Sequence, residues 1–386
     1  MFDGSGNLAL KIVLFANTEW YLYNFRRSLA SALVEAGHDV ILLSPSGPYG
    51  QKLLEMGFNW RSIALKRRSL DPFRELSVLW SLLKIMREEN PDIIHGFTIK
   101  CAVYGAIVAR IIKARSVSSV AGLGYVFTNM DMRAKLLRPI IRSIMKLTLG
   151  GKTSHIILQN PDDFRYFEFA EIVDPSNMSL IPGSGVNLER FAAPKPENRQ
   201  TSDPHKIVLA ARLLWDKGIA EFVEAARLIK AEGRNCEFLL AGTPDEGNPA
   251  SIPRACLLEW EEKGLIVCLG HVDNMPTLFA DANIVVLPSY REGLPKSLIE
   301  GAACARPLVA TDVPGCREVI SHEIDGLLVP AKDAQALAEA IMRLLDDPVL
   351  ARRLGLAALK KAISQFDEKI VNNATMVIYN NFYRGR

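Results

Sequence analysis

The sequence predicts an α/β protein of two domains, each built on a parallel sheet. At 386 residues the chain is longer than a single hydrophobic core usually serves. Apolar runs typical of buried strands alternate with helical patterns along most of its length. A polar, proline-rich segment interrupts this alternation once, at residues 192–205. We therefore expect residues 1–191 to form an N-terminal domain, residues 192–205 a linker and residues 206–365 a C-terminal domain.

The N-terminal half alternates strand and helix repeatedly. Gly37 is typical of a helix end that leads into a strand, and Asp71-Pro72 predicts a helix start with Asp71 as its N-cap. The apolar runs that predict strands cover residues 10–16, 39–44, 60–65, 92–97, 116–120, 153–158 and 177–181. Helical patterns separate these runs, which favours parallel pairing because parallel strands need crossover connections.

The C-terminal half repeats the pattern. Strands are predicted near residues 206–210, 237–241, 265–269, 283–288, 307–310 and 327–329. Amphipathic helices are predicted from Asp333 to Leu345 and from Val349 to about Ser364, and the stretch from Phe366 to Tyr383 is helical with one apolar face. The second sheet is therefore also expected to be parallel.

The cysteines and the hydropathy of the sequence argue against a disulfide-bonded, a metal-binding or a membrane-spanning protein. The chain has six cysteines without a Cys-x2-Cys pair, so we expect reduced core thiols and no metal site. No run reaches the ~18 apolar residues of a membrane span. The first residues lack the basic region of a secretory signal, and the run from Leu10 to Ala16 is better interpreted as a first strand.

Charge is distributed unevenly along the chain. Residues 1–195 carry a formal charge of +7 and the remainder −4, which gives the net +3 of the whole chain. A basic N-terminal half favours an anionic partner. The cations are too sparse, and interleaved aromatics too few, to indicate nucleic acid.

Two carboxylates stand eight residues apart after a predicted strand of the C-terminal half. Glu292 comes before a predicted helix and Glu300 lies inside it. At ~1.5 Å per residue this spacing covers about 12 Å, roughly the span of a sugar nucleotide from its sugar to its ribose. The backbone amides of residues 293–297 between them mark a helix N-terminus, which attracts anions. The alternative is a pair of solvated charges beside an ordinary helix.

Two cations follow another predicted strand of the same half. Arg212 and Lys217 come after the strand 207–211, and Gly218 then opens a helical pattern. Arginine offers a planar fork to phosphate oxygens and lysine a mobile point charge. Ligands collect at the carboxyl ends of parallel strands, where both segments carry their polar groups. The pattern favours a phosphate-containing ligand.

At these residues the chain resembles the retaining GT-B glycosyltransferases of family four. The resemblance covers nearly the whole chain and is strongest from Asn160 to Asp347. Its motifs are Ala211-Arg212 with Lys217-Gly218, Glu292-x7-Glu300, Ile181-Pro182-Gly183-Ser184-Gly185-Val186, Thr311-Asp312-Val313-Pro314-Gly315, and Asp325-Gly326-Leu327-Leu328-Val329-Pro330 followed by Asp333. It implies two Rossmann-like domains facing across a cleft, with the C-terminal helix, residues 366–386, packing back on the N-terminal domain.

The resemblance also implies roles for the site residues, without a metal or a cofactor. Arg212 and Lys217 would stabilise the diphosphate of a nucleotide-sugar donor, and Glu292 would hold hydroxyls of its sugar. The implied donor-binding residues are Glu300 on the ribose, the segment Gly293, Leu294, Pro295 and Lys296 on the diphosphate, and Gly242 and Val272 near the nucleotide. Family members favour front-face transfer, in which the leaving phosphate helps to deprotonate the acceptor.

The first loop of the N-terminal half contains no G-x-G-x-x-G run, which argues against a nicotinamide dehydrogenase. Its Asn17 and Tyr23 suit an acceptor sugar, although Trp20 and Tyr23 could equally cap the sheet. His95 ends a predicted strand at the expected cleft. It is a candidate for donor or acceptor contact, or else a satisfied, half-buried histidine.

The loop after strand 116–120 departs from relatives that carry a sugar-contacting histidine there. It contains Gly122-Leu123-Gly124-Tyr125-Val126-Phe127, which resembles the subgroup that adds N-acetylhexosamines to undecaprenyl-diphosphate-linked saccharides. A loop lined by backbone, with Gly124, leaves room for an acetamido group. The resemblance therefore implies a UDP-sugar donor and a lipid-linked saccharide acceptor.

A basic amphipathic helix is predicted in the N-terminal half. Apolar residues alternate there with the cations Arg133, Lys135, Arg138, Arg142 and Lys146, and a second cluster stands at residues 66–68. Such a helix fits an anionic bilayer, or else is an ordinary surface helix with a cationic face. With a lipid-linked acceptor, we expect a cytoplasmic protein bound peripherally to the inner membrane surface.

Three other functions remain open on the sequence. Some family members make soluble glycosides, and the same fold serves nucleotide-sugar epimerases. The third is a non-catalytic protein that binds nucleotide sugars. Arg212, Lys217, Glu292 and Glu300 together argue against the last, since a scaffold has no need of all four.

Overall fold

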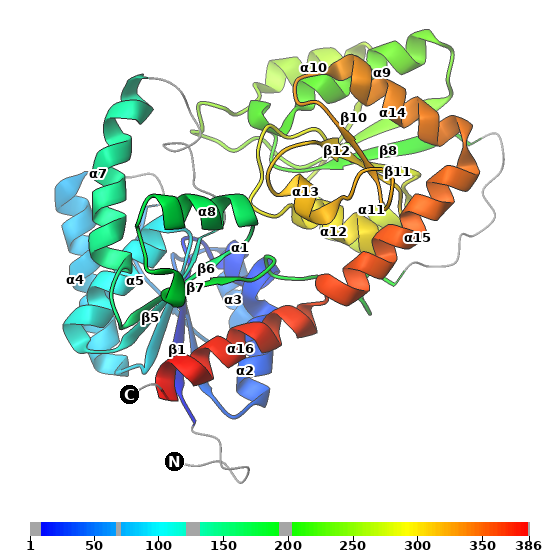
Figure 1. Cartoon of the computed structure of the whole chain (residues 1–386). Helices are drawn as coiled ribbons and strands as arrows, with labels where there is room; N and C mark the ends of the chain where they lie inside the picture. The colour runs from blue at the N-terminus through cyan, green and yellow to red at the C-terminus, as the bar shows by residue number, and fades with distance from the viewer. Residues whose placement is uncertain (1–8, 67–70, 121–131, 193–202, 385–386) are drawn as a thin grey trace. The chain divides into compact units, whose positions relative to one another are not determined.

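The structure is a computed structural model that describes residues 9–66, 71–120, 132–192 and 203–384, without the side chains of 132–137, 140 and 384. The chain forms two compact units, Met1–Ser184 with Val371–Arg386, and Gly185–Ile370. Each contains one parallel sheet with helices on its faces (Figure 1). The predicted fold class, two α/β units with parallel sheets, is confirmed.

The boundary between the units lies earlier than the predicted one at residue 191. Val186 forms a β-bridge with Asp367, and Phe191 is buried in the core of the second unit. The thiol of Cys304 also donates to the carbonyl of Phe191, at 3.5 Å. Residues 185–191 therefore belong to the second unit, and the predicted linker already enters its first strand at His205.

The first sheet has seven strands in the order β3-β2-β1-β4-β5-β6-β7, all pairs parallel. The order reverses between β1 and β4, which are neighbours in the sheet although two other strands separate them in sequence. The strands are β1 (Lys11–Phe15), β2 (Asp39–Ser44), β3 (Asn59–Ser62), β4 (Ile93–Phe97), β5 (Arg115–Val120), β6 (Ser154–Leu158) and β7 (Met178–Leu180).

Helices cover both faces of this sheet. They are α1 (Glu19–Tyr21), a π-helical turn (Leu22–Arg26), α2 (Arg27–Glu35), α3 (Pro48–Glu55), α4 (Pro72–Glu89), α5 (Ile99–Ile112), α7 (Met132–Leu149), α8 (Pro161–Phe169) and α16 (Glu368–Arg384). The Asp71 carboxylate accepts from the Phe73 and Arg74 amides, which confirms the predicted cap of α4. Val371 and Tyr379 of α16 pack with α2 and strand residues in one core cluster, so the end of the chain belongs to the first unit.

The second sheet has six parallel strands in the order β10-β9-β8-β11-β12-β13. Its order reverses between β8 and β11, where Ile207 pairs with Ile284. The strands are β8 (His205–Ala210), β9 (Cys236–Ala241), β10 (Val267–Gly270), β11 (Ile284–Leu287), β12 (Leu308–Thr311) and β13 (Leu327–Val329).

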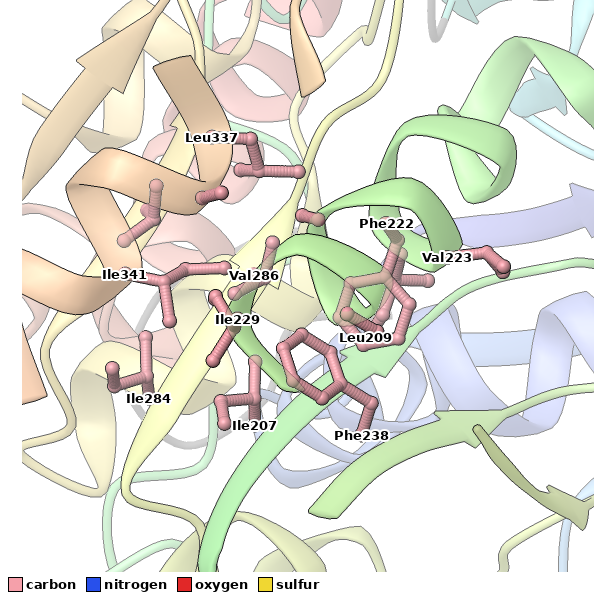
Figure 2. Packing of buried hydrophobic residues seen from close by; sticks show 14 of the residues in the cluster. Ile207, Leu209, Phe222, Val223, Ile229, Phe238, Ile284, Val286, Leu337 and Ile341 are labelled. Atoms are coloured by element: carbon pink, nitrogen blue, oxygen red, sulfur yellow. The ribbon is translucent and has the colours of Figure 1, made fainter. Parts of the chain in front are cut away.

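The strands of this sheet are buried on both faces, because one apolar layer packs against each face. Figure 2 shows one of these layers, where Ile207 and Leu209 of β8 meet Phe222 and Ile229, and Ile341 packs nearby. The helices of the unit are a 3₁₀ turn (Trp215–Lys217), α9 (Ile219–Ala231), α10 (Arg254–Glu262), α11 (Met275–Asp281), α12 (Lys296–Ala303), α13 (Cys316–Val319), α14 (Ala334–Asp346) and α15 (Pro348–Gln365). This packing fixes the ends of β8 and β11, from which the candidate site is built.

Candidate functional site

The candidate site lies in the second unit, at the carboxyl edge of its sheet. β8 runs into the segment that holds Arg212 and Lys217, and β11 runs into the segment that holds Ser289 and Glu292. These two strands flank the point where the strand order reverses. In open α/β sheets, ligands bind at such a topological switch point.

Lys217 and Glu292 form an ion pair at this edge. The Lys217 Nζ lies 2.5 Å from the Glu292 Oε1, and the side chains are only 17% and 12% exposed. The Ser289 hydroxyl donates to the same oxygen at 2.7 Å. Ser289 is held in turn by the Thr311 hydroxyl, which donates to its carbonyl. A predicted phosphate-binding cation and a predicted sugar-binding carboxylate therefore meet in one partly desolvated cluster.

Close contacts between backbone segments hold both Lys217 and Glu292 in place. Gly218, next to Lys217, has φ +68°, and a Cβ there would lie 2.0 Å from the Pro288 carbonyl oxygen. Gly315 has φ +84°, and a Cβ would lie 2.7 Å from the Glu292 carbonyl oxygen. Only glycine fits such positions. The two segments of the site therefore pack backbone to backbone.

Gly218→Ala is expected to destabilise the second unit more than Gly233→Ala does. Both glycines have positive φ, but a Cβ on Gly233 meets nothing within 4 Å. The control loses about 1 kcal/mol to backbone strain, and overpacking against Pro288 adds about 1–3 kcal/mol at Gly218. Thermal unfolding of both variants measures the difference. Equal melting temperatures for the two variants would show that this contact does not constrain the Lys217 segment.

Arg212 is placed differently from Lys217. Its Nη1 lies 2.8 Å from Asp245 Oδ2, and its side chain is 48% exposed. Asp245 follows β9 and also accepts from the Asn248 amide at 3.1 Å. Asp245 is not among the residues predicted from the sequence, although its place shortly after a predicted strand could have signalled it. The structure thus gives each predicted phosphate-binding cation a carboxylate of its own.

Glu300 lies in the second turn of α12, which begins at Lys296 with Pro295 as its N-cap. The Lys296 Nζ is 3.9 Å from the Glu300 Oε1, and the Glu300 side chain is 12% exposed. Burial raises the pKa of Glu300, and the charges of Lys296 and Arg190 offset this in part. A buried carboxylate with a raised pKa, close to a switch point, is typical of a binding site.

Gly242 and Val272, predicted near the nucleotide, lie at the ends of β9 and β10. Gly242 has φ +148°, and a Cβ there would lie 1.9 Å from the Ala211 carbonyl oxygen. Its amide donates to the Gly270 carbonyl at 2.8 Å. The close approach of the Ala211 carbonyl therefore requires glycine at position 242, whether or not a nucleotide binds there. Val272 packs against the second unit's core. Nucleotide contact by either residue stays a prediction.

His95 of the first unit has partners on both ring nitrogens. It is 1% exposed; its Nδ1 is hydrogen-bonded to the Tyr379 hydroxyl, and its Nε2 lies 2.7 Å from the Ser119 Oγ. Burial lowers the pKa of His95 well below its usual range. These contacts favour the second alternative of the sequence analysis, a satisfied histidine. Tyr379 stands 284 residues later, so no local signal pointed to it.

The other sugar-contact candidates of the first unit are less constrained. Asn17 is half-buried after β1. The Tyr23 ring lies 5.1 Å from that of Tyr49, and Tyr23 packs against the first unit's core. That position agrees with a residue that caps the sheet. Gly124 lies outside the described residues.

Two cations of α7, Arg142 and Lys146, contact neighbouring groups of the first unit. The Arg142 guanidinium donates twice to the Ala170 carbonyl, at 3.0 and 2.6 Å, and so closes the C-terminus of α8. Lys146 forms an exposed ion pair with Glu171, and Arg138 is partly buried. Arg133 and Lys135 lie in α7, but their side chains are outside the described part. Arg142 is nevertheless exposed, and contact of these cations with lipid stays a prediction.

Two further findings concern the class of protein. Across the described ranges, no helix is long and apolar enough to cross a membrane. All six cysteines are free thiols, four of them buried, as the sequence analysis predicts for core residues.

Comparisons with known proteins agree with the sequence resemblance. The family model described as "Glycosyl transferase 4-like" matches residues 11–160, and the model described as "Glycosyl transferases group 1" matches residues 204–347. The chain is 31% identical to the N,N'-diacetylbacillosaminyl-diphospho-undecaprenol alpha-1,3-N-acetylgalactosaminyltransferase of Campylobacter jejuni, over 93% of this chain and 95% of the relative. It is 25% identical to the UDP-Gal:alpha-D-GlcNAc-diphosphoundecaprenol alpha-1,3-galactosyltransferase of Escherichia coli, over 73% and 74%.

Solved structures show the same likeness at the level of the fold. Anabaena HepE in complex with UDP-glucose superimposes with a TM-score of 0.78 at 17% identity, covering 96% of this chain and all of that one. A glycosyltransferase from Rickettsia africae gives 0.75 at 19% identity, covering 98% of this chain and all of that one.

Proposed function

Since this chain belongs to the group 1, 4-like glycosyltransferases of GT-B fold, we propose that it moves a sugar from a UDP-sugar to a polyprenyl-diphosphate-linked saccharide. The transfer retains the anomeric configuration and needs no metal. The observation that carries the proposal is the partly desolvated Lys217–Glu292 pair at the switch point of the second sheet. It supplies one group for the diphosphate and one for the donor sugar.

The chemistry follows from the charges of the two groups. The bond between the anomeric carbon and the β-phosphate oxygen breaks while the acceptor hydroxyl forms a new bond to the same face. The hydroxyl proton passes to the leaving phosphate. Negative charge grows on the diphosphate, and the Lys217 ammonium and the Arg212 guanidinium stabilise it. A cation already held in place reorganises little when that charge develops.

Glu292 and Glu300 hold the two ends of the donor. In the structure, Glu292 is paired with Lys217 and accepts from Ser289. When the diphosphate attracts Lys217, the Glu292 carboxylate accepts hydroxyl donors of the sugar instead. Glu300, buried one turn into α12, accepts the ribose hydroxyls. The helix N-terminus between them, residues 293–296, faces the diphosphate with its dipole.

The donor and acceptor classes rest on the relatives and on the sequence after β5. Both enzymes named above act on undecaprenyl-diphosphate-linked sugars, one of them as an N-acetylgalactosaminyltransferase. Residues 122–127 resemble the same subgroup. We therefore propose an N-acetylhexosamine as the transferred sugar, in the assembly of a surface polysaccharide or a glycan for protein attachment.

Nucleotide release tests this function. UDP-, GDP- and ADP-sugars are incubated with the protein, with and without a polyprenyl-diphosphate N-acetylhexosamine in detergent. We expect UDP release from one N-acetylhexosamine donor that depends on the lipid. Release that needs a small soluble acceptor instead would indicate a soluble glycoside. UDP binding without release from any donor would indicate a non-catalytic protein and contradict the proposal.

We also propose that the protein binds the cytoplasmic face of the inner membrane through the first unit. The outer face of α4 exposes Phe73, Leu76 and Trp80, which are 86%, 67% and 70% exposed and lie three or four residues apart. The exposed cations Lys84 and Arg87 continue this face along the helix. Aromatic side chains beside cations suit the interface of an anionic bilayer.

Removing the aromatic residues of α4 is expected to release the protein from vesicles. The double variant Phe73→Ser/Trp80→Ser loses two large exposed apolar groups, so binding to phosphatidylglycerol vesicles should fall about tenfold or more in flotation. Val349→Ser, in α15 of the second unit, removes a residue that is 78% exposed and serves as the control. Unchanged flotation of the double variant would exclude α4 as the membrane contact.

A further inference from the structure

The first unit contains a buried arginine whose charge has no counter-ion in the described part of the chain. Arg26 ends the π-helical turn after α1 and is 4% exposed. Its Nη2 donates to the Tyr21 hydroxyl at 3.1 Å, and its guanidinium carbon lies 4.4 Å from the centre of the Phe97 ring. Its Nε is buried without a partner among the described residues. An unpaired buried cation is costly for a protein to keep.

The guanidinium lies where the first sheet reverses its strand order. Phe97 is the last residue of β4, and Tyr21 follows β1 by a few residues. β1 and β4 are the neighbours that flank the reversal. This is the position in the first sheet that corresponds to the Lys217–Glu292 position in the second. A π-helical turn at such a place is itself typical of functional sites.

The surroundings of Arg26 are neutral hydrogen-bonding groups and aromatic rings. Burial lowers the pKa of His95 and raises that of Tyr379, and the charge of Arg26 acts on both groups in the lowering direction. Their side chains are hydrogen-bonded to each other. The carboxylate closest in sequence, Glu19, lies against Gly47 at the start of α3 and forms no ion pair with Arg26. A lone cation in such surroundings selects an anion.

We propose that Arg26 binds the phosphate or diphosphate group of the acceptor, at the carboxyl edge of the first sheet. This inference rests on the proposed function, because it assigns the anionic part of the acceptor to a residue. The planar guanidinium offers a fork that matches phosphate oxygens. The Phe97 ring and the Tyr21 hydroxyl hold it in place, so little side-chain freedom is lost on binding. Low solvent exposure strengthens the attraction.

Binding and stability together test the assignment. Titration calorimetry with farnesyl diphosphate and with inorganic pyrophosphate is done in saturating UDP, which occupies the second unit. We expect Arg26→Met to weaken binding of farnesyl diphosphate at least about tenfold, and Arg26→Lys to weaken it less. The control is Arg27→Met, at the next residue, whose guanidinium lies over Tyr23 at 4.8 Å. It should bind like the wild type.

The same variants separate a binding role from a structural one. Without ligand, Arg26→Met should melt at or above the wild-type temperature, since it removes an uncompensated buried charge. A lower melting temperature with unchanged diphosphate binding would show that Arg26 only supports the fold, and would overturn the inference. Binding of inorganic pyrophosphate but not of farnesyl diphosphate would also overturn it, because the ligand would then be a free anion.

Steady-state kinetics of the full reaction provide the third test of the role of Arg26. In the full reaction, Arg26→Met should raise the KM for the lipid acceptor while the KM for the donor stays unchanged. If the protein instead glycosylates an acceptor without phosphate, the proposed function fails, whereas the calorimetric result still shows whether Arg26 binds diphosphates. The two failures are therefore distinguishable.

Discussion

Lys217→Ala should lower the turnover number about 10²- to 10³-fold, the usual cost of removing one positioned donor from a developing negative charge. In the structure, the Lys217 Nζ lies 2.5 Å from Glu292 and its side chain is only 17% exposed, so solvent screens it little. The variant also leaves the Glu292 carboxylate without its cation. Steady-state kinetics with varied donor measure turnover and donor KM separately.

Lys206→Ala is the matched control for this prediction. Lys206 lies at the amino end of the same strand, β8, and its Nζ is 2.5 Å from Asp281. Removing this half-exposed pair should leave turnover within about threefold of the wild type, because exposed ion pairs contribute little. Similar turnover in Lys217→Ala and Lys206→Ala would show that the Lys217–Glu292 pair is structural, and would remove the main support for the proposed site.

Glu300→Ala should weaken binding of UDP about 10²-fold with little change in turnover. Charge-assisted hydrogen bonds are worth about 1.5–3 kcal/mol each, and the ribose offers two hydroxyls. These hydroxyls are held alike in ground and transition states, so their loss affects affinity rather than the chemical step. Calorimetry with UDP measures the affinity directly. Glu259→Ala is the control, since Glu259 in α10 also pairs with a lysine four residues later, Lys263, at 2.5 Å, but its side chain is 57% exposed.

Whereas removing the Glu300 carboxylate should weaken UDP binding, it should increase the stability of the folded protein at neutral pH. Burial raises the pKa of Glu300 above its ordinary value of 4.5, so the folded state resists ionisation that the unfolded chain accepts. Ionised Glu300 therefore lowers stability at neutral pH, and the cost disappears as pH falls through the raised pKa towards 4.5. Glu300→Gln should melt higher than the wild type at pH 7, with a difference that shrinks on acidification. A Gln variant that is less stable at pH 7 and still binds UDP normally would contradict a binding role.

Local sequence patterns were sufficient for most of the fold, and they place the candidate residues Lys217 and Glu292 near strand ends. Parallel strands are buried on both faces, so the runs that end at Ala210 and Leu287 are recognisable from their apolar residues alone. Lys217 and Glu292 are candidates in the sequence because each lies in the polar segment that follows such a strand. Their contact was not derivable in this way. It depends on β8 and β11 being neighbours, which is a property of the whole sheet.

The features that the sequence does not predict depend on contacts between segments that are far apart in the chain. The pair of His95 and Tyr379 joins β4 to α16, and no pattern in either segment indicates the other. The unit boundary is predicted after Phe191 because the polar, proline-rich segment begins at residue 192, whereas in the structure Phe191 already packs in the second core. In the N-terminal half, Phe73 and Trp80 match the spacing of a core face, yet α4 buries Val78 and Leu82 instead. The spacing of apolar residues identifies the faces of a helix, but it does not determine which face packs against the sheet.

The most direct test of the central claim is the structure of the product. The protein is incubated with its UDP-N-acetylhexosamine donor and a polyprenyl-diphosphate saccharide, and the anomeric configuration of the extended lipid is determined by NMR. We expect one added N-acetylhexosamine with the configuration it had in the donor. A product of inverted configuration would contradict the proposed front-face transfer at Lys217 and Glu292, and an unmodified lipid with hydrolysed donor would contradict the proposed acceptor.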